Sequence, residues 1–174
     1  MIHLYTGDGK GKTTAGLGLA LRAAGAGLRV AAVFLMKGGR SSEIAALRQL
    51  PGVTVIEDAG GEVFGKWGVQ FSYQMNDEAK AEYREALRAA LAAAAAAPAD
   101  LLLLDEACSA VSTGMVALAD LLALIEARRA DTEIVLTGRD PAPELLALAD
   151  YVSEIHKIKH PFDRGAVARK GIEY

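Results

Sequence analysis

The sequence predicts an α/β fold in which helices cover both faces of a mostly parallel central sheet. Short β-branched or leucine-rich runs alternate with longer alanine-rich stretches, as expected where helices pack on a parallel sheet. The 174 residues suffice for one hydrophobic core, and the chain has no internal repeat or proline-rich linker. We therefore expect a three-layer sandwich that forms a single domain over residues 1–174.

The strands are predicted where apolar residues cluster between turn-forming residues. The expected strands are residues 2–6, 29–36, 53–57, 101–105, 133–137 and 151–156. Helices are expected to fill most of the intervals. The clearest is "NDEAKAEYREALRAALAAAAAAP", in which Asn76 is a candidate N-cap, acidic residues occupy the first turn and Pro98 ends the helix.

The stretch "GGEVFGKWGVQFSYQM", residues 60–75, mixes glycines with four aromatic residues. Over its length it has neither helical nor strand periodicity, so it is expected to be an irregular loop. Long irregular loops in compact domains often carry function. The alternative is a surface loop that its aromatic side chains hold in place.

Composition excludes several classes of protein. The longest apolar runs, such as "LAAAAAA" from Leu91, are far shorter than the roughly 20 residues that span a bilayer, and no secretory signal is recognisable, so a cytoplasmic protein without membrane contact is expected. The single cysteine, Cys108, cannot form an internal disulfide. The net charge is -3 and the basic residues are dispersed, which argues against a nucleic-acid surface.

The motif "GDGKGKTT" joins the first expected strand to the first helix. A glycine-rich turn before Lys-Thr at a helix N-terminus directs backbone N–H groups at phosphate oxygens, so the motif predicts a P-loop, although Thr6 is an imperfect first residue. In this interpretation Lys12 neutralises the outer phosphates and Thr13 offers its hydroxyl to Mg²⁺. The expected nucleotide-binding residues are Gly7, Asp8, Gly9, Lys10, Gly11, Lys12, Thr13 and Thr14.

A second motif, "LLLLDEA", is an expected buried strand that ends in Asp105 and Glu106. Acidic residues at the carboxyl end of a parallel strand lie where open α/β sheets bind ligands. Together with Thr13, these two carboxylates are therefore candidate Mg²⁺ ligands. The alternative is a pair that caps the following helix.

Several motifs together resemble one family, the corrinoid adenosyltransferases of the P-loop type. They are "YTGDGKGKTTAGLGLALRAAG", "LLLLDEA", "VLTGRD" and the ending "ADYVSEIHKIKHPFDRGAVARKGIEY", so the resemblance covers essentially the whole chain. It implies a RecA-like P-loop NTPase fold. It also implies transfer of the 5′-deoxyadenosyl group of ATP to the Co(I) centre of cobalamin or cob(I)yrinic acid a,c-diamide, with release of triphosphate.

The resemblance also implies roles for particular residues. Lys12 and Glu106 would be catalytic, with Mg²⁺ as cofactor and with ATP and a reduced corrinoid as substrates. The family's Phe-x-aromatic pattern maps onto Phe71 and Tyr73, which would exclude the lower axial ligand of cobalt; Trp67 is an alternative to Tyr73. Arg139, expected to emerge at the same sheet edge as Lys12, would bind triphosphate or corrinoid unless it lies on the surface.

The resemblance further implies a homodimer that serves cobalamin synthesis or salvage and that receives electrons from a reductase. Several relatives have an extension before the first strand, so closure over the nucleotide is expected to come from another segment or a partner subunit. Two other functions remain open. One is a P-loop ATPase or kinase in which Glu106 orients water or a hydroxyl, and the other is a nucleotide-gated corrinoid-binding module.

Overall fold

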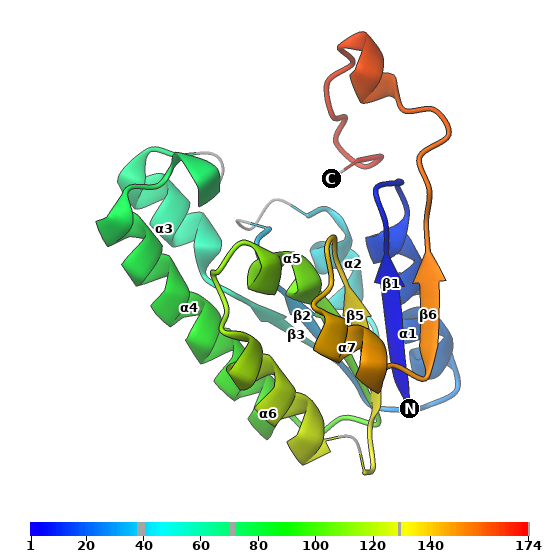
Figure 1. Ribbon diagram of the computed structural model, residues 1–174. Coiled ribbons are helices and arrows are strands. Elements are labelled where there is room, and N and C mark those ends of the chain that lie inside the picture. The colour runs from blue at the N-terminus through cyan, green and yellow to red at the C-terminus, as the bar shows by residue number, and fades with distance from the viewer. Residues whose placement is uncertain (38–40, 70–71, 129, 174) are drawn as a thin grey trace.

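A computed structural model describes residues 1–37, 41–69, 72–128 and 130–173. Within this part of the chain, six parallel strands form one sheet in the order β3-β2-β4-β5-β1-β6 (Figure 1). The strands are β1 Ile2–Thr6, β2 Val30–Phe34, β3 Val53–Glu57, β4 Leu101–Asp105, β5 Glu133–Thr137 and β6 Tyr151–Glu154. All six match the predicted strands, with β2 and β6 shorter than expected.

Helices cover both faces of this sheet, which confirms the predicted three layers (Figure 1). The α-helices are α1 Lys12–Gly25, α2 Glu43–Leu47, α3 Gly60–Trp67, α4 Asp77–Ala96, α5 Ala107–Ser112, α6 Leu118–Arg128 and α7 Pro143–Leu148, and the 3₁₀ turns are η1 Ser72–Gln74 and η2 Pro161–Arg164. β5 lies between β1 and β4, so one strand separates the two motif-bearing strands, as in a RecA-like sheet.

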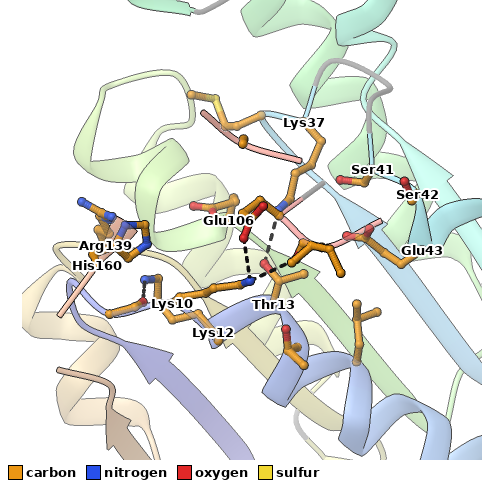
Figure 2. A pocket seen from close by; sticks show the side chains of 18 of the residues that line it. Lys10, Lys12, Thr13, Lys37, Ser41, Ser42, Glu43, Glu106, Arg139 and His160 are labelled. Atoms are coloured by element: carbon orange, nitrogen blue, oxygen red, sulfur yellow. Dashed lines mark hydrogen bonds and ion pairs between the residues drawn. The ribbon is translucent and has the colours of Figure 1, made fainter. Parts of the chain in front are cut away.

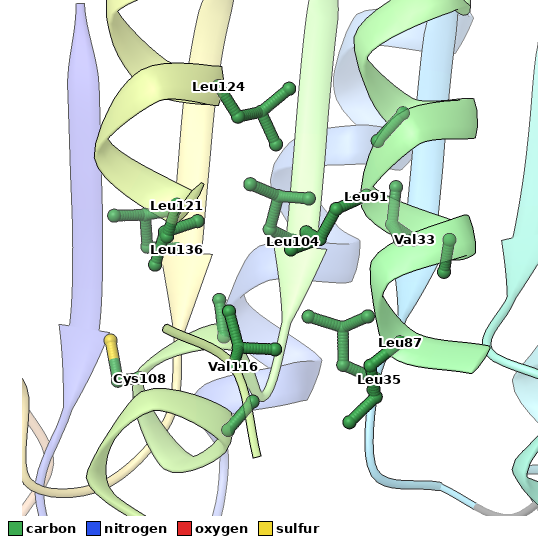
Figure 3. Packing of buried hydrophobic residues seen from close by; sticks show 14 of the residues in the cluster. Val33, Leu35, Leu87, Leu91, Leu104, Cys108, Val116, Leu121, Leu124 and Leu136 are labelled. Atoms are coloured by element: carbon green, nitrogen blue, oxygen red, sulfur yellow. The ribbon is translucent and has the colours of Figure 1, made fainter. Parts of the chain in front are cut away.

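The core is divided between the two faces of the sheet because side chains alternate along each strand. Leu101 and Leu103 of β4 pack with α1 and α2, whereas Leu102 and Leu104 pack with α4, α5 and α6. Figure 3 shows Leu104 of β4 facing Leu91 of α4. All five residues of β2 and of β4 are buried, which explains their continuous apolar sequences.

Helix α4 begins and ends where the sequence predicts. The Asn76 side chain accepts a hydrogen bond from the backbone N–H of Ala79 at 2.8 Å, and Asp77 and Glu78 lie in the first turn. The helix stops at Ala96, two residues before Pro98. Among the residues that the structure describes, no helix combines the length and apolar character that a membrane span requires.

The prediction of an irregular loop over residues 60–75 is wrong for its first half, which forms α3. Val63 and Phe64 are buried, and the Phe64 ring meets Tyr83 of α4 edge-on at 5.1 Å between centroids. Packing of this apolar stripe on α4 stabilises the helix although its glycines lower its intrinsic propensity. The prediction was wrong because it interpreted the glycines as a sign of irregular structure.

A surface ion pair joins the starts of β2 and β4. Asp100 accepts hydrogen bonds from the Arg29 backbone N–H and guanidinium, which lowers the Asp100 pKa from 3.8 to about 2. Because the folded pKa lies below the ordinary value, this stabilisation is present above about pH 4 and is lost as the pH falls towards 2. We expect Asp100→Asn to lower the urea-unfolding free energy more at about pH 7 than at about pH 3; an equal difference at both would contradict this pairing.

Candidate active site

The P-loop residues lie at the carboxyl edge of the sheet and line a cavity of about 1320 Å³. Lys12 and Thr13 open α1, directly after the loop that follows β1. Glu106, after β4, and Arg139, after β5, line the same cavity (Figure 2). The structure thus brings the two motifs of the sequence together, because parallel strands end at one edge.

Two glycines of the loop are required by a contact that the sequence does not reveal. The Gly9 N–H donates to the Ile155 carbonyl oxygen, just after β6, at 2.7 Å. A Cβ atom on Gly9 would lie 2.7 Å from that oxygen, and one on Gly7 would overlap the same carbonyl. The glycines therefore allow the loop to pack against the chain after β6, in addition to any approach of the backbone to phosphate.

Lys12 is held inside the loop. Its Nζ donates hydrogen bonds to the carbonyl oxygens of Gly7 at 2.7 Å and Gly9 at 2.8 Å, and the residue is only 7% exposed. Burial, helped by the charge of Arg139, lowers the pKa of Lys12 from its ordinary value. An ammonium group has three donors, and two of them are used by these carbonyls; within the described part of the chain the third is left for an anion bound in the loop.

Asp105 and Thr13, both predicted to hold metal, are neighbours in the structure. Asp105 is fully buried; its Oδ1 accepts from Thr137 Oγ1 at 2.6 Å and its Oδ2 accepts from Thr13 Oγ1 at 3.3 Å. Glu106 follows directly and lines the cavity. The capping alternative gains no support, because the Glu106 side chain makes no capping hydrogen bond to α5.

Glu106 is fixed by a residue that the sequence analysis missed. Its backbone is left-handed, with φ of 61°, and its N–H donates to Thr137 Oγ1 at 2.9 Å. Ser109 Oγ donates to Glu106 Oε2 at 2.6 Å and accepts from the Arg139 N–H at 3.0 Å. Ser109 thus links the ends of β4 and β5; its position one helical turn after Glu106 was the available signal.

Lys37 is the second missed residue. Its Nζ lies 3.0 Å from Asp105 Oδ2 and 3.2 Å from Thr13 Oγ1, and Figure 2 shows the side chain reaching towards Thr13. Burial alone would lower the pKa of Lys37, but the charges of Asp105 and Glu106 outweigh burial and raise it. The signal in the sequence was a lysine directly after the second strand, at the same sheet edge.

Arg139 emerges at this edge as predicted. Its guanidinium donates to the Asp8 carbonyl oxygen at 3.4 Å, beside the P-loop. The preceding Gly138 has φ of 137°, and a Cβ atom there would lie 2.7 Å from the Ser109 backbone nitrogen. The close approach of β5 to α5 therefore depends on glycine.

We expect Gly138→Ala to lower both stability and activity, because it forces apart the segments that carry Arg139 and Ser109. The expected loss of unfolding free energy is about 2 kcal/mol, measurable by urea denaturation. Gly18→Ala on α1 is the matched control, since an added Cβ there meets nothing within 4 Å. Equal behaviour of the two variants would contradict the steric argument.

A family model described as ATP:corrinoid adenosyltransferase BtuR/CobO/CobP matches residues 1–174. The chain belongs to this family. The corrinoid adenosyltransferase of Pseudomonas aeruginosa is 35% identical, with 100% of this chain and 83% of the relative covered. Those of Escherichia coli K12 and Salmonella typhimurium are 33% and 34% identical, each with 100% of this chain and 85% of the relative covered.

Membership of the adenosyltransferase family confirms the resemblance and the activity class, ATP-dependent adenosylation of corrinoids in cobalamin biosynthesis or salvage. Among solved structures, one of a DNA replication initiation factor aligns with a TM-score of 0.41 and 16% identity, over 88% of this chain and 39% of that chain.

The aromatic residues of this adenosyltransferase are divided between cavity and core. Tyr73 lines the cavity and is 78% exposed, and Phe64, which the sequence analysis did not single out, also lines it. Trp67 packs against the core and donates from Nε1 to Glu82 on α4 at 2.9 Å. Phe71, predicted to be catalytic, lies outside the described residues.

The C-terminal segment lies over the P-loop. Lys10 Nζ donates to the carbonyl oxygen of Ile172 at 3.1 Å and to Glu173 Oε1 at 3.3 Å, and both of these residues line the cavity. Asp8 Oδ1 accepts from the Lys157 N–H at 2.9 Å. Lys10 and Asp8 are thus engaged by the chain after β6, while Thr14 lines the cavity beside Thr13.

Proposed function

We propose that the chain transfers the 5′-deoxyadenosyl group of ATP to the Co(I) centre of a reduced corrinoid and releases inorganic triphosphate. The observation that carries this proposal is the shared cavity. Lys12 and Thr13 on one side and Tyr73 on the other line one space of about 1320 Å³. A triphosphate in the loop and a corrin ring at the aromatic side would therefore meet.

The proposed reaction is a nucleophilic displacement at carbon. Co(I) supplies an electron pair to C5′ of the ribose, the C5′–O5′ bond breaks, and that pair leaves with the triphosphate, so the cobalt becomes formally Co(III). The nucleophile needs no deprotonation. The task of the protein is therefore to align the two substrates and to stabilise the departing negative charge, for which Lys12 and the loop N–H groups are placed.

Magnesium fits the residues at this site. Thr13 Oγ1 and Asp105 Oδ2 are 3.3 Å apart, and Lys37 already places a positive charge beside both oxygens, so the position attracts a cation. We propose that Thr13, Asp105 and Glu106 hold Mg²⁺ directly or through water, with phosphate oxygens as further ligands. The bound metal would neutralise charge on the triphosphate.

The test is an anaerobic absorbance assay with chemically reduced cobalamin and MgATP, followed by analysis of the products. Loss of the Co(I) band, a photolabile corrinoid and inorganic triphosphate are expected. ADP together with an unchanged corrinoid would instead indicate a phosphoryl-transfer enzyme. Binding of both substrates without any product would indicate a nucleotide-gated corrinoid-binding module.

Tyr73 is expected to act mainly when the corrinoid starts as Co(II). If its ring displaces the lower axial ligand, Tyr73→Ala should slow turnover from Co(II) at least about tenfold, a barrier change of about 1.4 kcal/mol, and spare pre-reduced Co(I). Phe71→Ala should behave alike. The discriminating control is Trp67→Phe. If this variant shows the selective loss and Tyr73→Ala does not, Trp67 faces the cobalt.

We also propose a cytoplasmic homodimer that receives electrons from a separate reductase. The edge strand β6 supports a dimer, because all four of its residues are exposed and Tyr151 and Val152 are each about half exposed. A strand edge of this kind can pair with a second chain. Light scattering should give twice the monomer mass, and Val152→Lys should lower it; a monomeric wild type would refute the proposal.

A further inference from the structure

Lys37 is not among the residues proposed above to hold Mg²⁺, yet its ammonium contacts two of them. Its ammonium is 3.0 Å from Asp105 Oδ2 and 3.2 Å from Thr13 Oγ1. We propose that Lys37 is an internal cation that holds the metal position closed until Mg²⁺ arrives with the nucleotide. The inference rests on the proposed function only in taking Thr13 and Asp105 as the residues that hold the metal.

A metal ion and the Lys37 ammonium cannot share these two oxygens. Mg²⁺ binds oxygen at about 2.0–2.1 Å, so an ion bound to both Thr13 and Asp105 would lie close to the lysine nitrogen. Two like charges at such a distance repel strongly where water is scarce, and Asp105 is fully buried. We therefore expect the ammonium to be displaced when the metal binds.

The backbone beside Lys37 is fixed by hydrogen bonds, and the side chain borders open space into which the ammonium can be displaced. The preceding Met36 has a left-handed backbone, with φ of 63°, and its N–H donates to the buried Asp58 carboxylate at 2.7 Å. Asp58 is held in turn by the Tyr83 hydroxyl at 2.6 Å. The Lys37 side chain is 21% exposed and lines the cavity, as do Glu43 and Glu106, so the displaced ammonium stays near negative charge.

The arrangement should favour binding of nucleotide-bound metal over binding of the free ion. A free divalent cation must displace Lys37 without any new anion to receive the ammonium. The magnesium complex of ATP brings phosphate oxygens that both complete the metal shell and attract the released lysine. The metal is thus expected to enter with the nucleotide and not before it.

The test is a titration of the protein with Mn²⁺ in the absence of nucleotide. Electron paramagnetic resonance of the free ion measures how much Mn²⁺ is bound. Lys37→Met should bind Mn²⁺ at least about tenfold more tightly than the wild type, because a neutral side chain no longer competes. Lys37→Arg, which keeps the charge, should bind as weakly as the wild type. Lys37→Gln repeats the test with a neutral polar side chain should Lys37→Met fail to fold.

The double variant Lys37→Met/Asp105→Asn tests whether the tighter Mn²⁺ binding of Lys37→Met involves Asp105. This double variant should lose the tighter binding. Three results would overturn the inference: equal Mn²⁺ affinity in folded Lys37→Gln and wild type, a gain that persists in the double variant, or wild-type binding that is as tight without ATP as with it. None of these results depends on adenosyl transfer. Failure of the cobalamin assay with the expected Mn²⁺ behaviour would therefore reject the proposed reaction and leave the role of Lys37 in place.

Discussion

Lys12→Ala is expected to reduce adenosyl transfer roughly 10³-fold, the loss typical of removing a pre-placed charge from a site where negative charge develops. Lys12 is the first residue of α1 and is nearly buried, with its ammonium anchored on Gly7 and Gly9. These contacts hold the charge inside the loop before any nucleotide binds. The loss should appear in kcat/KM measured with pre-reduced Co(I) and MgATP.

The control variant is Lys80→Ala, which removes a lysine from α4 outside the cavity lining. It should retain wild-type activity. Thermal unfolding of Lys12→Ala separates loss of chemistry from loss of fold, because the lysine also braces the loop. Activity within about tenfold of the wild type, in a folded variant, would refute a role for Lys12 in stabilising the leaving triphosphate.

Asp105→Asn is expected to lower the unfolding free energy by about 2 to 4 kcal/mol, independently of any ligand. The substitution leaves the Lys37 ammonium facing an amide in a buried position. The cost lies below that of a fully buried pair because the Lys37 side chain is partly exposed and can turn to solvent. Urea denaturation at neutral pH measures the difference.

Adding Lys37→Met to Asp105→Asn tests whether the cost comes from the unpaired lysine. The double variant should be more stable than Asp105→Asn alone, with a coupling of about 1 to 3 kcal/mol between the two sites. Thr13→Ala provides a comparison, since it removes the hydroxyl that donates to Asp105 and accepts from Lys37 but leaves the Lys37–Asp105 ion pair in place. Strictly additive effects would show that the Lys37–Asp105 ion pair does not stabilise the fold.

The sequence predicted the strands well because the central ones are covered on both sides. Strand β4 is wholly buried, so its sequence is a continuous apolar run that ends at the first carboxylate. Helix α3 was not predicted, because Gly60, Gly61 and Gly65 indicate a loop. The helix is stabilised by packing of its apolar side against α4. Val63, Phe64 and Trp67 do recur at helical spacing, but the prediction gave more weight to the glycines than to this short pattern.

The motifs of the site could be predicted from the sequence, but the contacts between its side chains could not. Three site residues could be expected at one sheet edge, because parallel strands end there. Asp105 is the last residue of β4, and Thr13 and Arg139 come shortly after β1 and β5. Lys37 could not be assigned, because its role depends on Asp105, a distant residue in the sequence, and on the left-handed Met36 that directs it. Contacts between side chains on separate strands have no signature in a single sequence.

The place of β1 in the sheet determines how late in synthesis this strand can find its partners. This first strand pairs only with β5 and β6 among the described strands, and the P-loop after it rests on Ile155. Both partner strands are translated only after β2, β3 and β4. A nascent chain therefore carries its phosphate loop long before the loop can take its final form, and a product truncated before β6 should lack nucleotide binding altogether.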